Sequence, residues 1–308
     1  MGGLVAVASL PSFGADDPGV FPKRGNFERL VLAYQHVHIG LEKPFSILHI
    51  SDTHFTSAYP DEDAKKQTLR EKRTQTFGGR QEEAIRDSLA WAKKNVDYVL
   101  HTGDLIDWQS RANFDLVKKY YGEAAGTMFG SMGNHEFSPS MWLEKDESSE
   151  AHKEKSRAKL SAAYPFDIEL ASTVVNGVNF VALDDVYGYV TARQVARFRD
   201  EAKKGLPIVL CMHVPFYTPH IWRANSKFWS PNRKFVRADV PDARGDYQKQ
   251  KTDVVTRDFI AYLKTEPLLK AILAGHLHIT VQDRFSPTAM QYVVGGNFMF
   301  HGQEVLFT

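Results

Sequence analysis

The sequence predicts an α/β fold, and this prediction rests on where its apolar runs and its polar residues fall. Five short, largely apolar runs are typical of strands buried inside a parallel sheet. They cover residues 45–50, 96–100, 127–132, 208–212 and 268–274. Polar residues suited to binding ions follow each run. Because ligand sites in open α/β sheets lie beyond the carboxyl ends of strands, we expect these residues to meet at one place.

The segments between these strands predict helices and further strands. Helices are expected at residues 80–95, 144–159 and 191–204, and strands at residues 179–183 and 291–294. Ala84, Ile85 and Leu89 give the first helix an apolar face at helical spacing. Thr191 is a suitable N-cap for the third helix.

Three segments have an unusual composition. Residues 57–79 are strongly charged and are interpreted as an insertion or mobile loop, and the charged helix at residues 144–159 is expected to be a solvated face with His152 at the surface. Residues 217–247 interleave aromatic and basic side chains, which suits either a substrate lid or an irregular insertion with its own small core. These side chains are Trp222, Arg223, Lys227, Phe228, Trp229, Arg233, Lys234, Phe235 and Arg237.

Charge and hydropathy exclude some classes of protein. The 308 residues carry 38 basic and 37 acidic side chains, a net charge of +1, which gives no broad electrostatic surface for nucleic acid or anionic membranes. No run approaches the roughly 18 apolar residues that a membrane span needs. The single cysteine, Cys211, lies in an apolar run and is expected to be a buried, inert thiol.

We expect one domain at residues 45–308, preceded by an N-terminal extension at residues 1–44. The polar motifs lie between residues 52 and 278, so a boundary within that interval would divide the site. Residues 1–15 resemble the tail of a secretory signal, but no basic residue precedes their apolar stretch. They are either a signal whose beginning is missing or a disordered N-terminus, and we favour export over a cytoplasmic location.

The polar residues after the strands contain the donors that transition-type divalent ions bind. They are Asp52-Thr53-His54, Gly103-Asp104, Gly133-Asn134-His135, His213 and Gly275-His276-Leu277-His278. Carboxylate, amide and imidazole donors without thiolate suit Mn, Fe or Zn. The Gly-Asn-His and Gly-His-x-His patterns are expected by chance only about once in 40 and once in 30 chains of this composition.

This ordered set resembles the calcineurin-like metallophosphoesterase superfamily, and the resemblance runs from about residue 45 to residue 300. It implies an α/β fold with four layers, an αββα sandwich of two mixed β-sheets flanked by helices. It also implies two divalent metal ions, Mn, Fe or Zn, in each chain. By this resemblance one ion would be bound by Asp52, His54 and His278, the other by Asn134, His213 and His276, and Asp104 would bridge both.

The resemblance also implies two catalytic residues. His135 would face the substrate and would donate a proton to the leaving oxygen or stabilise charge there. Asp107, three residues beyond Asp104, would hydrogen-bond His135, although a helix N-cap or a solvated loop charge is the alternative.

The implied activity is hydrolysis of a phosphate ester, a monoester or a diester, by a metal-bridging hydroxide, with a small-molecule substrate. His54 and Asp107 stand where purple acid phosphatases carry Gly and Tyr. Trp108 and Gln109 replace the arginine of the Ser or Thr phosphoprotein phosphatases, which favours the small-molecule branch. The alternatives are a metal-dependent nuclease of the same superfamily and a non-catalytic scaffold on this fold.

Overall fold

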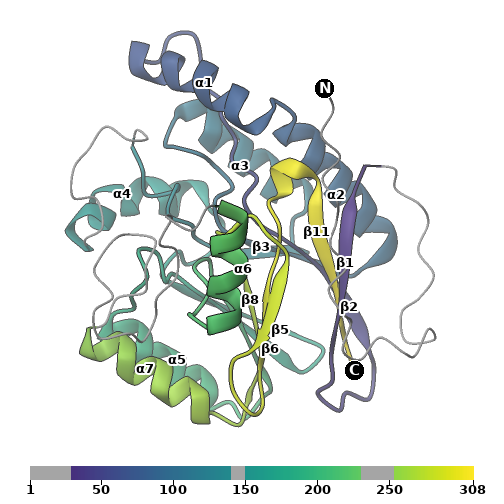
Figure 1. The fold of residues 1–308 in the computed structure, drawn as a ribbon. Helices are drawn as coiled ribbons and strands as arrows, with labels where there is room; N and C mark the ends of the chain where they lie inside the picture. Colours follow the sequence, from purple (N-terminus) through teal and green to yellow (C-terminus); the bar gives the residue numbers. More distant parts are fainter. Residues whose placement is uncertain (1–28, 140–149, 230–252) are drawn as a thin grey trace.

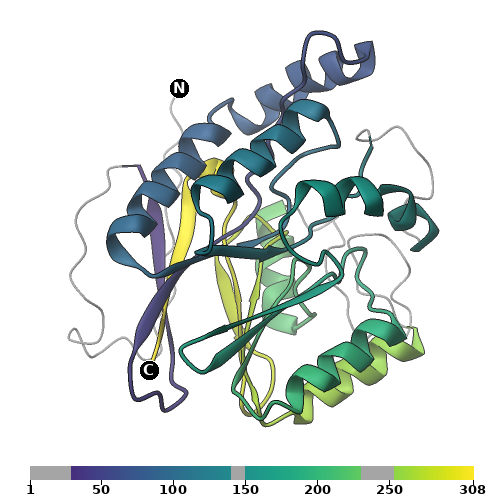
Figure 2. The same cartoon turned by 180° about the vertical axis from the view of Figure 1, so that it is seen from behind.

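Two mixed β-sheets lie face to face in the computed structural model, which describes residues 29–139, 150–229 and 253–308 (Figure 1). Helices cover the outer sides of the two sheets, so the layers run helix, sheet, sheet, helix (Figures 1 and 2). The predicted four-layer α/β fold is therefore confirmed.

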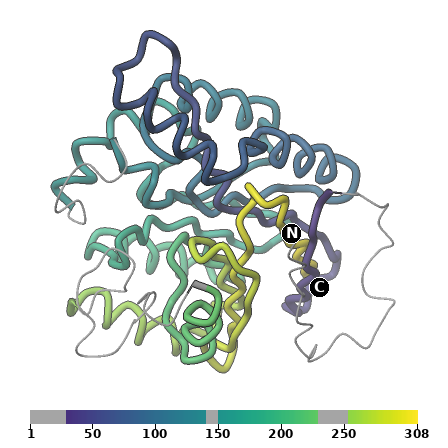
Figure 3. The backbone as a smooth tube through the Cα atoms, turned by 45° about the horizontal axis from the view of Figure 1, so that its top comes forward, coloured from purple at the N-terminus to yellow at the C-terminus, as the bar shows by residue number. Residues whose placement is uncertain are grey.

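The first sheet has five strands in the order β1-β11-β2-β3-β4. They are β1 (Val31–Val37), β11 (His301–Phe307), β2 (Phe45–Ile50), β3 (Tyr98–Thr102) and β4 (Met128–Ser131). β11 runs antiparallel to β2, and the other pairs are parallel. β11, the last strand, lies between β1 and β2, the first two strands of the described residues (Figure 3). Residues 31–37 thus belong to this sheet, although the sequence suggested a domain that starts at residue 45.

The second sheet has six strands in the order β5-β6-β7-β8-β10-β9. They are β5 (Leu170–Val175), β6 (Val178–Leu183), β7 (Ile208–Cys211), β8 (Leu269–Ala274), β10 (Met290–Val293) and β9 (Val281–Arg284). The two outermost pairs are antiparallel and the inner pairs are parallel.

The helices among the described residues differ in the sheet that they cover. They are α1 (Ala64–Phe77), α2 (Gln81–Asn95), α3 (Arg111–Glu123), α4 (Glu150–Ala163), α5 (Ala192–Ala202), α6 (Pro219–Trp229), α7 (Val254–Thr265) and a 3-10 turn at Asn297–Met299. α2 and α3 lie on the outer side of the first sheet, and α5 and α7 lie side by side on that of the second (Figures 1 and 2). None of these helices is long and apolar enough to cross a bilayer.

Alternating side chains along the strands build three apolar layers. In β2, Phe45 and Ile47 pack against the second sheet, whereas Leu48 and Ile50 pack against α2 and α3. Cys211 is fully buried in the layer between the sheets, as expected. Three apolar layers separate four layers of secondary structure, which is why the molecule is a sandwich.

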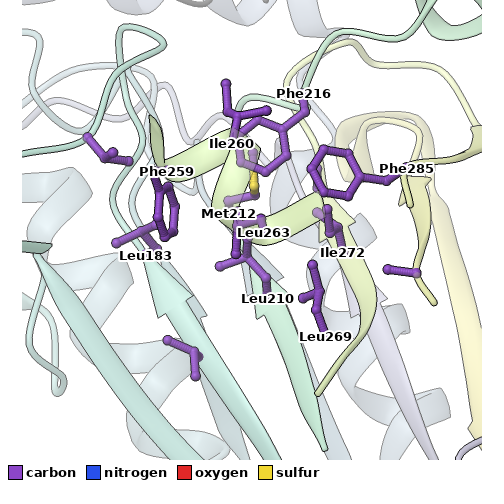
Figure 4. Close-up of a cluster of buried hydrophobic side chains, with 14 of the residues drawn as sticks. Leu183, Leu210, Met212, Phe216, Phe259, Ile260, Leu263, Leu269, Ile272 and Phe285 are labelled. Atoms are coloured by element: carbon purple, nitrogen blue, oxygen red, sulfur yellow. The ribbon is translucent and has the colours of Figure 1, made fainter. Parts of the chain in front are cut away.

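The third apolar layer joins the second sheet to α7. Leu183, Leu210 and Ile272 of the strands contact Phe259 and Leu263 of the helix (Figure 4). Full burial of such side chains contributes roughly 1.5–3 kcal/mol each. This packing fixes the ends of β7 and β8, from which two of the polar motifs project.

The predicted strands and helices agree well with these elements. The five strand runs correspond to β2, β3, β4, β7 and β8 with ends that differ by at most two residues. Thr191 caps α5 and forms a capping box with Gln194. Of the segment at residues 217–247, the structure describes only the part through α6; residues 230–252 and residues 1–15 lie outside the described residues.

Residues 57–79 were interpreted as an insertion or a mobile loop, and the mobile loop was wrong, because α1 occupies most of this segment. Asp63 caps its first turn, and Gly78 ends it in a left-handed conformation with φ 77°. The helix has little apolar surface of its own, and it is held by tertiary contacts such as that of Leu69 with the buried Trp108.

Of the helix predicted at residues 144–159, residues 144–149 lie outside the described residues and the rest belongs to α4. The expectation of a solvated helix with His152 at the surface was wrong for one face of α4. His152 is buried and its Nε2 donates to the carbonyl oxygen of Phe137 (2.9 Å). Lys153 is buried beside it, and its Nζ lies 2.9 Å from an oxygen of Asp184. A buried lysine paired with a carboxylate looks the same in sequence as a solvated one.

The loops that follow β3 and β4 are joined by one buried carboxylate, that of Glu136. Its Oε2 accepts hydrogen bonds from the backbone N–H groups of Asp104 (2.9 Å) and Gly133 (2.8 Å). Its Oε1 accepts from the backbone N–H of Leu105 (2.7 Å) and from the hydroxyl of Tyr164 (2.9 Å). Because a charged acceptor strengthens each bond, Glu136 holds the two loops in a fixed relation.

Replacing Glu136 by Gln should lower the free energy of unfolding by about 2 kcal/mol, because the amide nitrogen turns a donor toward backbone donors that remain buried. Urea unfolding measures this change, with Glu123→Gln at an exposed position of α3 as the matched control. Equal unfolding midpoints for the Glu136 variant and the wild-type chain would show that the two loops do not depend on this carboxylate.

Candidate metal centre

The polar motifs meet in three overlapping groups of potential ligands, and the potential ligand atoms of each group lie within 4.8 Å of one another. Asp104 belongs to two of the three groups. The groups are Asp52 with His54 and His278, His54 with Asp104 and His135, and Asp104 with His213 and His276. The expected convergence of strand ends from both sheets is therefore present.

Close approaches in this cluster join imidazoles to one another, as for His54 Nε2 and His278 Nε2 (3.1 Å), and join imidazoles to the two carboxylates. Asp104 Oδ2 lies 3.2 Å from His213 Nε2 and 3.7 Å from His54 Nε2. Asp52 Oδ1 lies 3.3 Å from His278 Nε2. Asp104 and Asp52 are thus each placed to hold a cation together with an imidazole nitrogen.

The imidazoles are oriented as metal ligands usually are. His213 Nδ1 donates to the carbonyl oxygen of Thr102 (2.7 Å), and His54 Nδ1 donates to Asp107 Oδ1 (3.0 Å). Such bonds fix the tautomer and leave Nε2 to face the site. Burial lowers the pKa of His54 to about 4, which keeps this imidazole in the neutral form that binds metals.

Buried polar atoms without a hydrogen bond also fit a bound cation. Among the described residues, no group forms a hydrogen bond with Asn134 Oδ1 or with His276 Nε2, although both atoms are shielded from solvent. Buried polar atoms are nearly always hydrogen-bonded, so the unsatisfied amide oxygen of Asn134 fits a divalent ion. The other ring nitrogen of His276, Nδ1, lies 3.2 Å from His213 Nε2. Burial opposes a charge on His213, yet Asp104 raises its pKa to about 10, so the carboxylates favour positive charge at this point.

The backbone places these residues by an uncommon conformation. Five of the candidate ligands have φ angles between 54° and 69°, in the left-handed region that residues other than glycine rarely adopt. The residues are Asp52, His54, Asp104, His276 and His278. Two residues that are two positions apart in an extended segment project to the same side, but Asp52 and His54, and likewise His276 and His278, are not extended. Left-handed residues concentrate at functional sites because the surrounding structure must hold them.

Glycines allow the loops to approach one another. A side chain at Gly133 would overlap Asp104, and one at Gly275 would overlap Ser51 and Asp52. Both glycines precede candidate ligands, so they are needed for the ligands to share one site.

Asp107 is a fully buried contact between His135 and the rest of the site. His135 Nδ1 lies 2.8 Å from Asp107 Oδ1 and also donates to the Asp107 carbonyl oxygen (3.0 Å). The N-cap of α3 is Ser110, so Asp107 is neither a helix cap nor a solvated charge. The side chain of His135 is 13% exposed, whereas that of His54 is 1% exposed, which makes His135 the more accessible of the two to a substrate.

Sequence reasoning missed two side chains that support this site. Arg73 of α1 binds Asp107, and its charged segment gave no sign of this. Glu136 stands directly after His135, where the family pattern carries Glu or Asp, but no role was assigned to it. Burial alone would raise the pKa of Asp107, yet the hydrogen bonds from Arg73 and the imidazoles hold it well below its usual range.

The motifs of the site lie within a match to a known protein family. The model of the calcineurin-like phosphoesterase family matches residues 45–280. A search of curated proteins found no match.

Several solved structures are similar. A dimetal phosphatase from Danio rerio is 16% identical, with a TM-score of 0.48 over 83% of this chain and 88% of that one. A purple acid phosphatase from yellow lupin (Lupinus luteus) seeds is 11% identical, with a TM-score of 0.48 over 84% of this chain and 45% of that one. A 5'-nucleotidase from Candida albicans is 12% identical, with a TM-score of 0.40 over 86% and 48% of the two chains.

The match to the family model covers more than half of the chain and includes every motif that forms the cluster. The protein belongs to the calcineurin-like phosphoesterase family, and it is a hydrolase that acts on phosphoric ester bonds.

Proposed function

We propose that the protein hydrolyses a small-molecule phosphate monoester or diester with the help of two divalent ions. The observation that carries this proposal is the position of Asp104, which belongs to ligand groups on both sides of the cluster. A shared carboxylate is the feature that distinguishes a dinuclear centre from two separate metal sites.

The chain offers a set of ligands for each ion. Asp52, His54 and His278 would hold the first ion, and Asn134, His213 and His276 would hold the second. Asp104 would contribute to both. Two such ions supply a hydroxide nucleophile near neutral pH and neutralise charge on the phosphate.

His135 is the candidate proton donor. Asp107 fixes its Nδ1, so its Nε2 faces the site, 3.8 Å from Asp104 Oδ2. A proton held at Nε2 would pass to the leaving oxygen of the ester. Asp107 would then act through His135 as a positioning residue.

Replacing Asp104 by Asn should weaken the binding of Mn²⁺ by more than about 100-fold, because even residues that only support a ligand change metal affinity by 10–100-fold. Hydrolysis of a chromogenic phosphate ester should fall to background. Calorimetric titration and a rate assay measure the two effects, with Asp115→Asn at an exposed position as the control. Undiminished activity of the Asp104 variant contradicts the mechanism.

Replacing His135 by Ala should leave metal binding intact and lower kcat by roughly 10²–10⁴-fold, the usual contribution of a general acid. Elemental analysis and steady-state kinetics on the same preparation separate the two quantities. If the His135 variant instead loses both ions, His135 is a metal ligand and its assignment as a proton donor is wrong.

The experiment that tests the function directly is a panel of phosphate monoesters and diesters assayed with Mn²⁺, Zn²⁺ and Fe²⁺ before and after chelation. Hydrolysis that stops with the chelator and returns with added metal is the expected result. Turnover that persists without metal, or no turnover of any member, would argue against the proposed function.

A further inference from the structure

One buried carboxylate orients two imidazoles of the site. Asp107 Oδ1 accepts from His54 Nδ1 (3.0 Å) and lies 2.8 Å from His135 Nδ1. Both rings then turn Nε2 toward Asp104 Oδ2, at 3.7 Å for His54 and 3.8 Å for His135. The direction of the Asp107 carboxylate therefore determines the orientation of two imidazole rings, that of a candidate metal ligand and that of the candidate proton donor.

The carboxylate of Asp107 is itself bound by the guanidinium of Arg73 through two hydrogen bonds. The guanidinium donates through Nε to Oδ2 (2.6 Å) and through Nη2 to Oδ1 (2.8 Å). Two parallel bonds from a planar group fix the plane of the carboxylate as well as its position. Arg73 also carries a permanent positive charge, which compensates a carboxylate that has no exposed surface.

Arg73 reaches Asp107 in a defined orientation because its own surroundings are packed. Its guanidinium lies over the ring of Phe77, 4.8 Å from the centroid, and Phe77 stacks on His54 with centroids 4.4 Å apart. Arginine, phenylalanine and histidine therefore form one layered contact between α1 and the metal centre.

The rest of α1 is anchored close to the same loop. Leu69 packs on Trp108, the residue after Asp107, and the hydroxyl groups of Thr74 and Thr56 lie 2.7 Å apart. These contacts connect the helix to the two loops that follow β2 and β3. A helix that does not belong to the sheet scaffold thus delivers a charge to the site.

We propose that Arg73 is a positioning residue of the metal centre, which fixes Asp107 so that His54 binds metal and His135 faces the substrate. This inference rests on the proposed function for the role of His135. The part that concerns His54 and Asp107 depends only on metal binding.

Replacing Arg73 by Met should weaken the binding of Mn²⁺ by about 10–100-fold, the usual range for residues that support a metal ligand. The value of kcat, measured at saturating Mn²⁺, should fall while KM changes little, because Arg73 acts through Asp107 and does not bind the substrate. Arg73→Lys keeps one charge but loses the planar fork, so its affinity and kcat should lie between those of the Met variant and the wild-type chain.

A second readout follows the imidazoles directly. Nitrogen NMR of the histidine rings in the metal-free protein should show that His54 and His135 carry a proton on Nδ1 in the wild-type chain. In Arg73→Met this preference should be reduced. Lys72→Met, at an exposed position of the same helix, is the control and should alter neither the metal affinity nor these signals.

Circular dichroism and thermal unfolding establish that each variant is folded. If Arg73→Met does not fold, Arg73→Lys provides the same measurements. Wild-type metal affinity together with unchanged ring signals in a folded Arg73→Met or Arg73→Lys protein would overturn the proposal. Unchanged metal affinity with a raised KM would overturn it in another way, because Arg73 would then act on the substrate.

Failure of the proposed function gives a different pattern. In that case the wild-type chain binds two ions and hydrolyses no phosphate ester, while the metal titration and the ring signals of the Arg73 variants still report on Asp107.

Discussion

The site depends on the carboxylate of Asp104, which is shared by ligand groups from both sheets. A single carboxylate can serve both sides only if the loops after β2, β3, β4, β7 and β8 end within a few ångströms of one another. Three apolar layers hold the sheets at a fixed separation, and left-handed residues turn the ligands inward at the strand ends. The packing of the two sheets therefore brings together ligands that lie far apart in the sequence.

Buried charges around this site are matched by groups of three different kinds. Asp107 is paired with Arg73, and Glu136 is surrounded by backbone N–H groups and a tyrosine hydroxyl. Asp184 is paired with Lys153. Asp52 and Asp104, by contrast, lie beside His278 and His213, and Asn134 Oδ1 has no hydrogen bond among the described residues. This contrast explains why cations fit at Asp52 and Asp104 and not at Asp107, Glu136 and Asp184.

Local patterns in the sequence were sufficient for the candidate ligands and for seven of the eleven described strands, whereas β1, β5, β9 and β11 were not predicted. Buried strands show as apolar runs, and the spacing within the motifs identified the residues that meet at the site. Tertiary contacts were not visible in the same way. α1 has too little apolar surface to show as a helix, and it is held by Leu69 on Trp108 and by Arg73 on Asp107. In the sequence, Lys153 is indistinguishable from a solvated lysine, because its partner Asp184 lies 31 residues away and meets it only in the folded chain.

The left-handed conformation of Asp52 and His54 could not be predicted from the sequence for a related reason. A left-handed φ in a residue other than glycine is imposed by the surrounding structure, so it cannot be predicted from the residue type. The aromatic and basic segment at residues 217–247 keeps its two interpretations, since α6 accounts for only part of it.

The most direct measurement of the central claim is anomalous scattering from crystals of the protein grown with Mn²⁺. The account predicts two peaks in each chain, on either side of the Asp104 carboxylate and about 3.5–4 Å apart. A single peak, or two peaks that do not share Asp104, would contradict it.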